Sequence, residues 1–97
     1  MGKTSKQYIR VEWLHSFPQD PIVIYSEIDE ERWEVRKVEV FADGGMFFSD
    51  GRTSTGTTGL GEVPIPSIEE IALDPQFKPQ LITADAFEEV WVLATNP

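Results

Sequence analysis

The chain has 97 residues, of which eight are Lys or Arg and seventeen are Asp or Glu, so its formal net charge is −9. This length is enough for one hydrophobic core, and no apolar run approaches the ~20 residues that cross a bilayer. There is no cysteine, which excludes disulfides, thiolate metal sites and a cysteine nucleophile. The N-terminus lacks the apolar stretch of a secretory signal. Together these two features lead us to expect a cytoplasmic protein.

The N-terminal part predicts a short tail followed by two strands. Residues 1–7 are polar and aperiodic, and we expect a flexible tail ahead of a single domain at 8–97. Residues 8–14 alternate apolar and charged side chains, as in a half-buried strand. Residues 22–28 are rich in β-branched and aromatic side chains and predict a second strand.

Residues 32–41 contain many helix formers, but their apolar residues scatter around a helical wheel and leave no stripe that could dock. They fit a third strand whose apolar phase slips near Arg36-Lys37, which predicts a β-bulge there. Residues 29–31 and 43–45 are then turns, and a short fourth strand begins at Met46.

The C-terminal half predicts a long loop and two helices. The loop covers residues 49–66, which are rich in Gly, Ser and Thr. Ser67 and Glu70 form a capping-box pattern at the start of a short helix. Thr83 can cap a final helix over residues 84–95, which has an apolar stripe at helical spacing.

The order of these elements predicts an α+β fold, because strands come first and helices last. We expect an antiparallel β-meander of about four strands with the two C-terminal helices packed on one of its faces. Trp13 or Trp33, together with Phe87 and Trp91, are the expected core between sheet and helix.

The charge is concentrated in the body of the chain, since the residues from Val11 onward contain five basic and seventeen acidic ones, 5 − 17 = −12. Such a body repels phosphate backbones and anionic membranes and attracts a basic protein. Two acidic groups are the candidate partner-binding residues. The first is expected on an exposed hairpin turn and the second on one helix face: Glu27, Asp29, Glu30, Glu31 and Glu34, and Asp85, Glu88 and Glu89.

Residue types that carry out chemistry form no recognisable catalytic pattern. The single histidine, His15, lies beside Ser16, but neighbouring side chains of an extended segment point to opposite sides. We therefore expect His15 to be structural or merely exposed, and not catalytic. One histidine and no cysteine predict no metal site, and no motif implies a cofactor.

Three segments carry a resemblance to a known family. The strings Y-I-R-V-E-W-L-H at residues 8–15, Y-S-E-I-D-E-E-R-W-E-V-R-K-V-E at 25–39 and G-L-G-E-V-P-I-P at 59–66 resemble small bacterial proteins grouped only as a domain of unknown function. The resemblance spans residues 8–91. It implies one intact domain of bacterial or phage origin, with the N-terminal tail outside it. No catalytic residue can be transferred from the family, because none is defined.

Two functions from different classes follow. The first is a non-enzymatic, acidic protein-binding module, either an inhibitor or immunity-type protein or a phage-encoded antagonist of bacterial defence, which occludes a basic toxin, nuclease or other effector. The second is a small-molecule-binding domain or small enzyme with a site under the 49–61 loop. That site would be lined by His15, Arg52, Trp33 or Tyr25. A scaffold role in a larger assembly is a third possibility.

Overall fold

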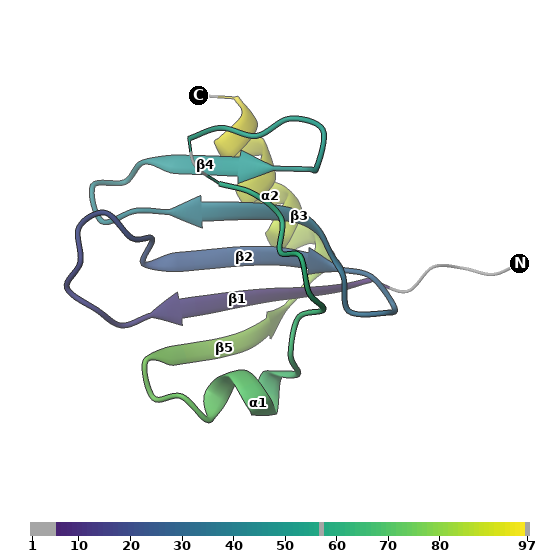
Figure 1. Cartoon of the computed structure of the whole chain (residues 1–97). Helices are drawn as coiled ribbons and strands as arrows, with labels where there is room; N and C mark the ends of the chain where they lie inside the picture. Colours follow the sequence, from purple (N-terminus) through teal and green to yellow (C-terminus); the bar gives the residue numbers. More distant parts are fainter. Residues whose placement is uncertain (1–5, 57, 97) are drawn as a thin grey trace, which may run out of the picture.

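A computed structural model describes residues 6–56 and 58–96, and its five strands form one antiparallel sheet in the order β4-β3-β2-β1-β5 (Figure 1). The elements in chain order are β1 (Gln7–Trp13), β2 (Val23–Ile28), β3 (Glu34–Val40), β4 (Met46–Ser49), α1 (Ile68–Ala72), β5 (Phe77–Ile82) and α2 (Ala84–Thr95). None of the described helices is long and apolar enough to span a membrane. The predicted α+β class and antiparallel meander are confirmed.

The N-terminal tail predicted at residues 1–7 lies mostly outside the described residues. Gln7 is part of β1, where it pairs with Ile28, so the sheet begins one residue earlier than the predicted domain boundary.

The fifth strand was not predicted from the sequence. β5 contains Pro79, which cannot donate a hydrogen bond to a ladder, and charged or polar residues alternate with its apolar ones. Such a segment is tolerated at an edge, and β5 is an edge strand that pairs with β1 alone. It fills the side of β1 that a four-strand meander would leave open.

The bulge in β3 is confirmed, one residue before the predicted dipeptide. Glu27 pairs with Arg36 whereas Ile28 pairs with Glu34, so Val35 is the extra residue. Because side chains alternate along a strand, this insertion changes which of them share a face. It places Glu34 and Lys37 on one face of the sheet and Arg36 on the other.

α2 covers one face of the sheet through the apolar stripe that the sequence predicts. Thr83 caps the helix by accepting a hydrogen bond from the amide of Ala86. Phe87 is completely buried, and its ring centroid lies 5.4 Å from that of Tyr8. Trp91 packs edge-on against Phe48 of β4 at 5.3 Å.

The partners expected for this helix were wrong. Trp13 and Trp33 do not form the core with Phe87 and Trp91. The Trp13 ring lies against His15 and Phe77, at 4.5 Å and 5.7 Å between centroids, on the face that α2 does not cover. Trp33 follows the hairpin turn and is 43% exposed.

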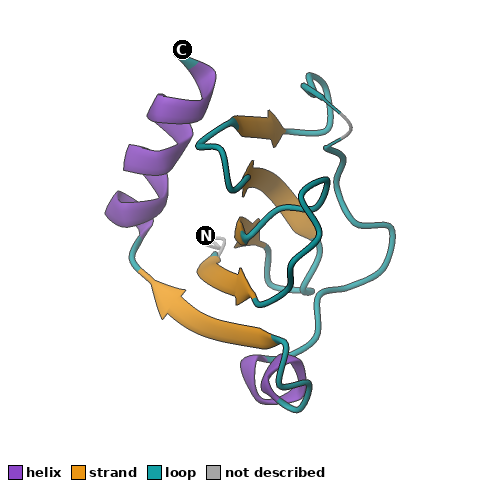
Figure 2. Cartoon of the chain, turned by 90° about the vertical axis from the view of Figure 1, so that its left-hand side faces the viewer, coloured by secondary structure: helices purple, strands orange, loops and turns teal. Residues whose placement is uncertain are grey.

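The two helices also lie on different faces, not on one. Ile68 and Ile71 of α1 pack against the cluster of Ile9, Val11 and Ile28, on the face opposite α2. Figure 2 shows α2 on one side of the sheet and the loop before α1 on the other. Successive side chains of β1 point to opposite faces, so Ile9 meets α1 whereas its neighbour Tyr8 meets Phe87 of α2. The capping box predicted at Ser67 is present.

Replacing Phe87 with Ala is expected to lower the free energy of unfolding by about 3–4 kcal/mol, because it leaves a cavity between α2 and the sheet. Val92→Ala on the exposed side of the same helix, where the side chain is 53% accessible, is the control and costs under about 0.5 kcal/mol. Urea unfolding followed by circular dichroism measures both. Equal losses in the two variants would contradict the observed orientation of α2.

Candidate functional site

The first acidic group is divided between the turn and the interior. Glu27 and Glu34 are buried, so the expectation of an exposed run is wrong for these two residues. Asp29 organises the turn itself, since its Oδ1 accepts hydrogen bonds from the amides of Glu31 and Trp33 at 3.0 Å and 2.8 Å. Within this group, Glu30 and Glu31 are the exposed residues, and Asp29 is half-buried.

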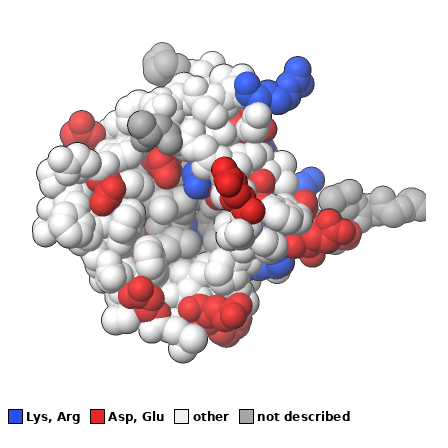
Figure 3. Space-filling view, in the orientation of Figure 1, with Lys and Arg blue, Asp and Glu red and all other residues white. Residues whose placement is uncertain are grey.

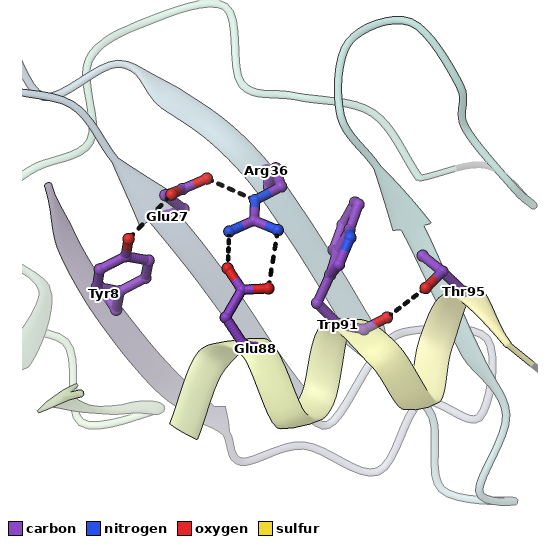
Figure 4. A network of polar contacts seen from close by, with 6 residues as sticks. All are labelled: Tyr8, Glu27, Arg36, Glu88, Trp91 and Thr95. Atoms are coloured by element: carbon purple, nitrogen blue, oxygen red, sulfur yellow. Dashed lines mark hydrogen bonds and ion pairs between the residues drawn. The ribbon is translucent and has the colours of Figure 1, made fainter. Parts of the chain in front are cut away.

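Glu27 belongs to a network that joins α2 to the sheet (Figure 4). Its carboxylate accepts hydrogen bonds from Arg36 Nε at 2.6 Å and from the Tyr8 hydroxyl at 3.0 Å. Arg36 also pairs with Glu88 of α2 through both terminal guanidinium nitrogens. The guanidinium carbon lies 4.9 Å from the ring centroids of both Phe87 and Trp91.

The pKa values in this network follow from burial and hydrogen bonding. Burial, followed by the hydrogen bond to Glu27, raises the pKa of Tyr8. The hydrogen bond from Arg36 lowers the pKa of Glu88. Desolvation by itself lowers the pKa of Arg36, but its hydrogen bonds to Glu88 and Glu27 outweigh that effect and raise it. Arg36 and Glu88 therefore remain charged at neutral pH and hold α2 in place.

Replacing Arg36 with Met is expected to destabilise the fold by about 2–3 kcal/mol, because it leaves the buried Glu27 carboxylate without its cation. The double variant Arg36→Met, Glu27→Gln removes the uncompensated charge and should recover part of that loss. Urea unfolding at pH 7 of the wild type, both single variants and the double variant gives the coupling. Additive effects would show that the pair does not couple.

The second acidic group remains at the surface of α2. Asp85, Glu88 and Glu89 are exposed, as predicted. They line a shallow hollow together with Val92 and Leu93, which are 53% and 63% exposed. α2 itself contains no Lys or Arg, and the cation that Glu88 pairs with is Arg36 of β3.

Sheet pairing brings the two acidic groups to the same end of the sheet. Gln7 pairs with Ile28, so β2 ends where β1 begins, and the turn at residues 29–31 follows. Tyr8 pairs with Ile82, so β5 also ends there and α2 starts at once. Groups more than fifty residues apart in the sequence therefore share one end of the molecule, which the sequence alone did not predict.

The opposite face carries a cavity of about 390 Å³ between the sheet and the segment that leads into α1. Figure 3 shows this face, which is hollowed near its centre. Most of the lining is apolar and comes from β1, β2, β5, the loop and α1: Ile9, Val11, Ile24, Phe77, Ile65 and Ile71.

A buried polar cluster forms one end of this cavity. Glu34 accepts hydrogen bonds from the Ser26 hydroxyl at 2.6 Å and from the Gly61 amide at 2.8 Å. Lys37 Nζ lies 3.3 Å from Glu34 and donates to the carbonyl of Gly59 at 2.9 Å. The sequence did not reveal this cluster, because its members become neighbours only through the bulge and the folding back of the loop.

Arg32 holds the loop wall of the cavity. Its guanidinium donates to the carbonyls of Ile65 and Pro66 at 3.0 Å and 2.5 Å, and its own carbonyl accepts from the Ile65 amide at 2.6 Å. Among the described residues Arg32 is the one non-glycine residue with positive φ, at 73°. The turn demands this left-handed conformation, which an L-residue adopts at a cost of about 1–2 kcal/mol. Two of the segments that carry the family resemblance, residues 25–39 and 59–66, are therefore in contact in the fold.

Replacing Arg32 with Asn tests this attachment, because Asn tolerates the left-handed backbone but has no guanidinium. We expect hydrogen exchange at the Ile65 amide to accelerate by about tenfold or more. Arg52→Asn, at an exposed position of the same loop, is the control and should leave exchange at Ile65 unchanged. Unchanged exchange in Arg32→Asn would show that packing alone holds the segment.

The residues expected to line a site under the 49–61 loop do not line the cavity. Those residues were His15, Arg52, Trp33 and Tyr25. His15 uses both ring nitrogens locally: Nε2 is 2.8 Å from the Pro21 carbonyl, and Nδ1 accepts from the Phe17 amide at 2.9 Å. Within the described part of the chain, no three His, Cys, Asp or Glu side chains are placed to hold a metal ion.

Comparisons with known proteins give one finding. Neither the curated proteins nor the solved structures contain a match to the chain. A family model described as a domain of unknown function, DUF6881, matches residues 7–96. The match begins with the first residue of β1 and includes every strand and helix. The resemblance to a domain of unknown function is therefore confirmed, and the chain belongs to the DUF6881 family.

Proposed function

We propose that this protein is a non-enzymatic, acidic protein-binding module that occludes a basic partner. An inhibitor or immunity-type protein, or a phage-encoded antagonist of bacterial defence, acts in this way on a toxin, nuclease or other effector. The proposal places it in the cytoplasm, where an intracellular effector would be met.

The observation that carries the proposal is the exposed face of α2. Val92 and Leu93 expose more than half of their surface beside Asp85 and Glu89. An exposed apolar patch rimmed by polar residues is typical of a protein interface. Because α2 has no Lys or Arg, a cationic protein surface is the complementary one.

The hairpin turn at residues 29–31 adds negative charge at the same end of the molecule as the start of α2. Glu31 is exposed there, and Asp29 stabilises the turn that presents it. Glu88 serves two purposes in this proposal, since it faces solvent on α2 but also pairs with Arg36. Glu27 and Glu34 are left out of the binding surface because their carboxylates are buried in internal contacts.

The test uses charge reversal away from Glu88, so that the Arg36 network stays intact. The full chain is immobilised and used to capture proteins from a lysate of the organism that encodes it. The captured protein is then purified and its association rate measured. We expect Asp85→Lys, Glu89→Lys to slow association about tenfold or more at low salt, and added salt to slow the wild type.

Glu62→Lys, Glu69→Lys is the matched control, because it makes the same change in net charge at exposed positions elsewhere. Hen lysozyme serves as an unrelated basic protein. If the two double variants slow association equally, the interaction depends on net charge alone and α2 is not the binding surface. The same conclusion follows if the wild type binds lysozyme as tightly as it binds the captured protein. An unchanged rate in the α2 variant would reject this surface directly.

A further inference from the structure

We propose that the cavity on the face opposite α2 is a binding site for a small organic ammonium compound with an apolar body. This site is separate from the proposed protein-binding surface. The alternatives are an anionic ligand, a neutral ligand or a cavity that binds nothing.

The size and walls of the cavity suit an apolar body. Its volume of about 390 Å³ falls within the ~300–1,000 Å³ typical of small-molecule sites. The sheet contributes Ile9 and Ile24, and the facing wall contributes Ile65 and Ile71. Removing such surface from water by filling the cavity provides the main driving force.

The inner polar end does not require a charged ligand. The Glu34 carboxylate is already bonded to Ser26, Gly61 and Lys37. No buried side-chain nitrogen or oxygen of the described residues lacks a hydrogen-bond partner. This end can therefore contact the body of a ligand without leaving a buried charge unpaired.

The charged residues at the rim of the cavity determine which ligand charge is preferred. Glu70 and Asp74 of the α1 segment line the cavity and are exposed. Glu70 Oε1 accepts a hydrogen bond from the Ser67 amide, and Asp74 Oδ1 accepts one from the Gln76 amide. The remaining lining charges are Glu34 and Lys37, which pair with each other, so the two rim carboxylates leave a net negative field. That field attracts an ammonium group and repels a carboxylate.

The site is built before a ligand arrives. Arg32 attaches the wall at Ile65 and Pro66 to the hairpin, and Thr58 of the same loop donates to Glu39 of β3 at 2.7 Å. A preformed cavity saves a ligand the entropic cost of ordering the loop.

The probes are three molecules that share one aromatic body: tryptamine, indole and indole-3-acetate. They are titrated into the full chain with isoleucine methyl groups labelled for NMR. We expect tryptamine to shift the methyl signals of Ile9, Ile24, Ile65 and Ile71, and to bind at least about fivefold more tightly than indole-3-acetate. Ile82, on the face that carries α2, is the internal control.

Two pairs of variants locate the site. A Cβ at Gly61 would meet Glu34 Oε1 at 3.6 Å and Ile65 Cδ1 at 4.0 Å, which are ordinary contacts directed at the cavity lining. Gly61→Leu should therefore fill the cavity and abolish binding of tryptamine. Gly59→Leu, where a Cβ meets no atom within 4 Å, should retain it.

Glu70→Gln, Asp74→Asn removes both rim charges but keeps the local hydrogen bonds, and should bring the affinities of tryptamine and indole-3-acetate within about twofold of each other. Absence of methyl shifts with all three probes, shifts centred on Ile82, or no preference for tryptamine in the wild type would overturn the proposal. Asp85→Lys, Glu89→Lys should leave tryptamine binding unchanged, so failure here and failure of the proposed function are distinguishable.

Discussion

The structure depends on how the charged side chains of β3 are divided between the two faces of the sheet. The extra residue at Val35 turns Arg36 toward α2, while Glu34, Lys37 and Glu39 face the loop. A regular strand would place Arg36 and Glu34 on the same side. The bulge therefore allows one short strand to attach a helix on one face and a long loop on the other.

The two attachments rely on different interactions. On the α2 side, Arg36 combines ion pairs to Glu27 and Glu88 with stacking between Phe87 and Trp91, so its charge is compensated where it is partly buried. On the loop side, most contacts of β3 and its hairpin are to backbone groups. The loop has few apolar side chains of its own, and these contacts hold it in a fixed path across the sheet. The cavity lies beneath that path.

The two proposed binding sites lie on opposite faces of the sheet and would bind their partners through different interactions. The exposed part of α2 offers acids and apolar side chains to a large partner, whereas the cavity offers apolar walls with acids at the rim. Both depend on β3, since Arg36 orients α2 and Glu34 holds the loop at Gly61. Acidity thus has two roles in this fold: some carboxylates organise the interior, and the exposed ones give the surface its field.

The sequence by itself determined the α+β class, four of the five strands, the bulge, both helix caps and the apolar stripe of α2, because periodicity and capping are local properties. It also determined the excess of negative charge. Only the tertiary structure decided that β5 joins the edge of β1, that the helices lie on opposite faces, and that Glu27 and Glu34 are buried while Asp85 and Glu89 are not. These outcomes depend on contacts between residues far apart in the chain. The local sequence around a carboxylate is the same whether the carboxylate faces water or pairs with a distant arginine, so the sequence pattern does not distinguish the two.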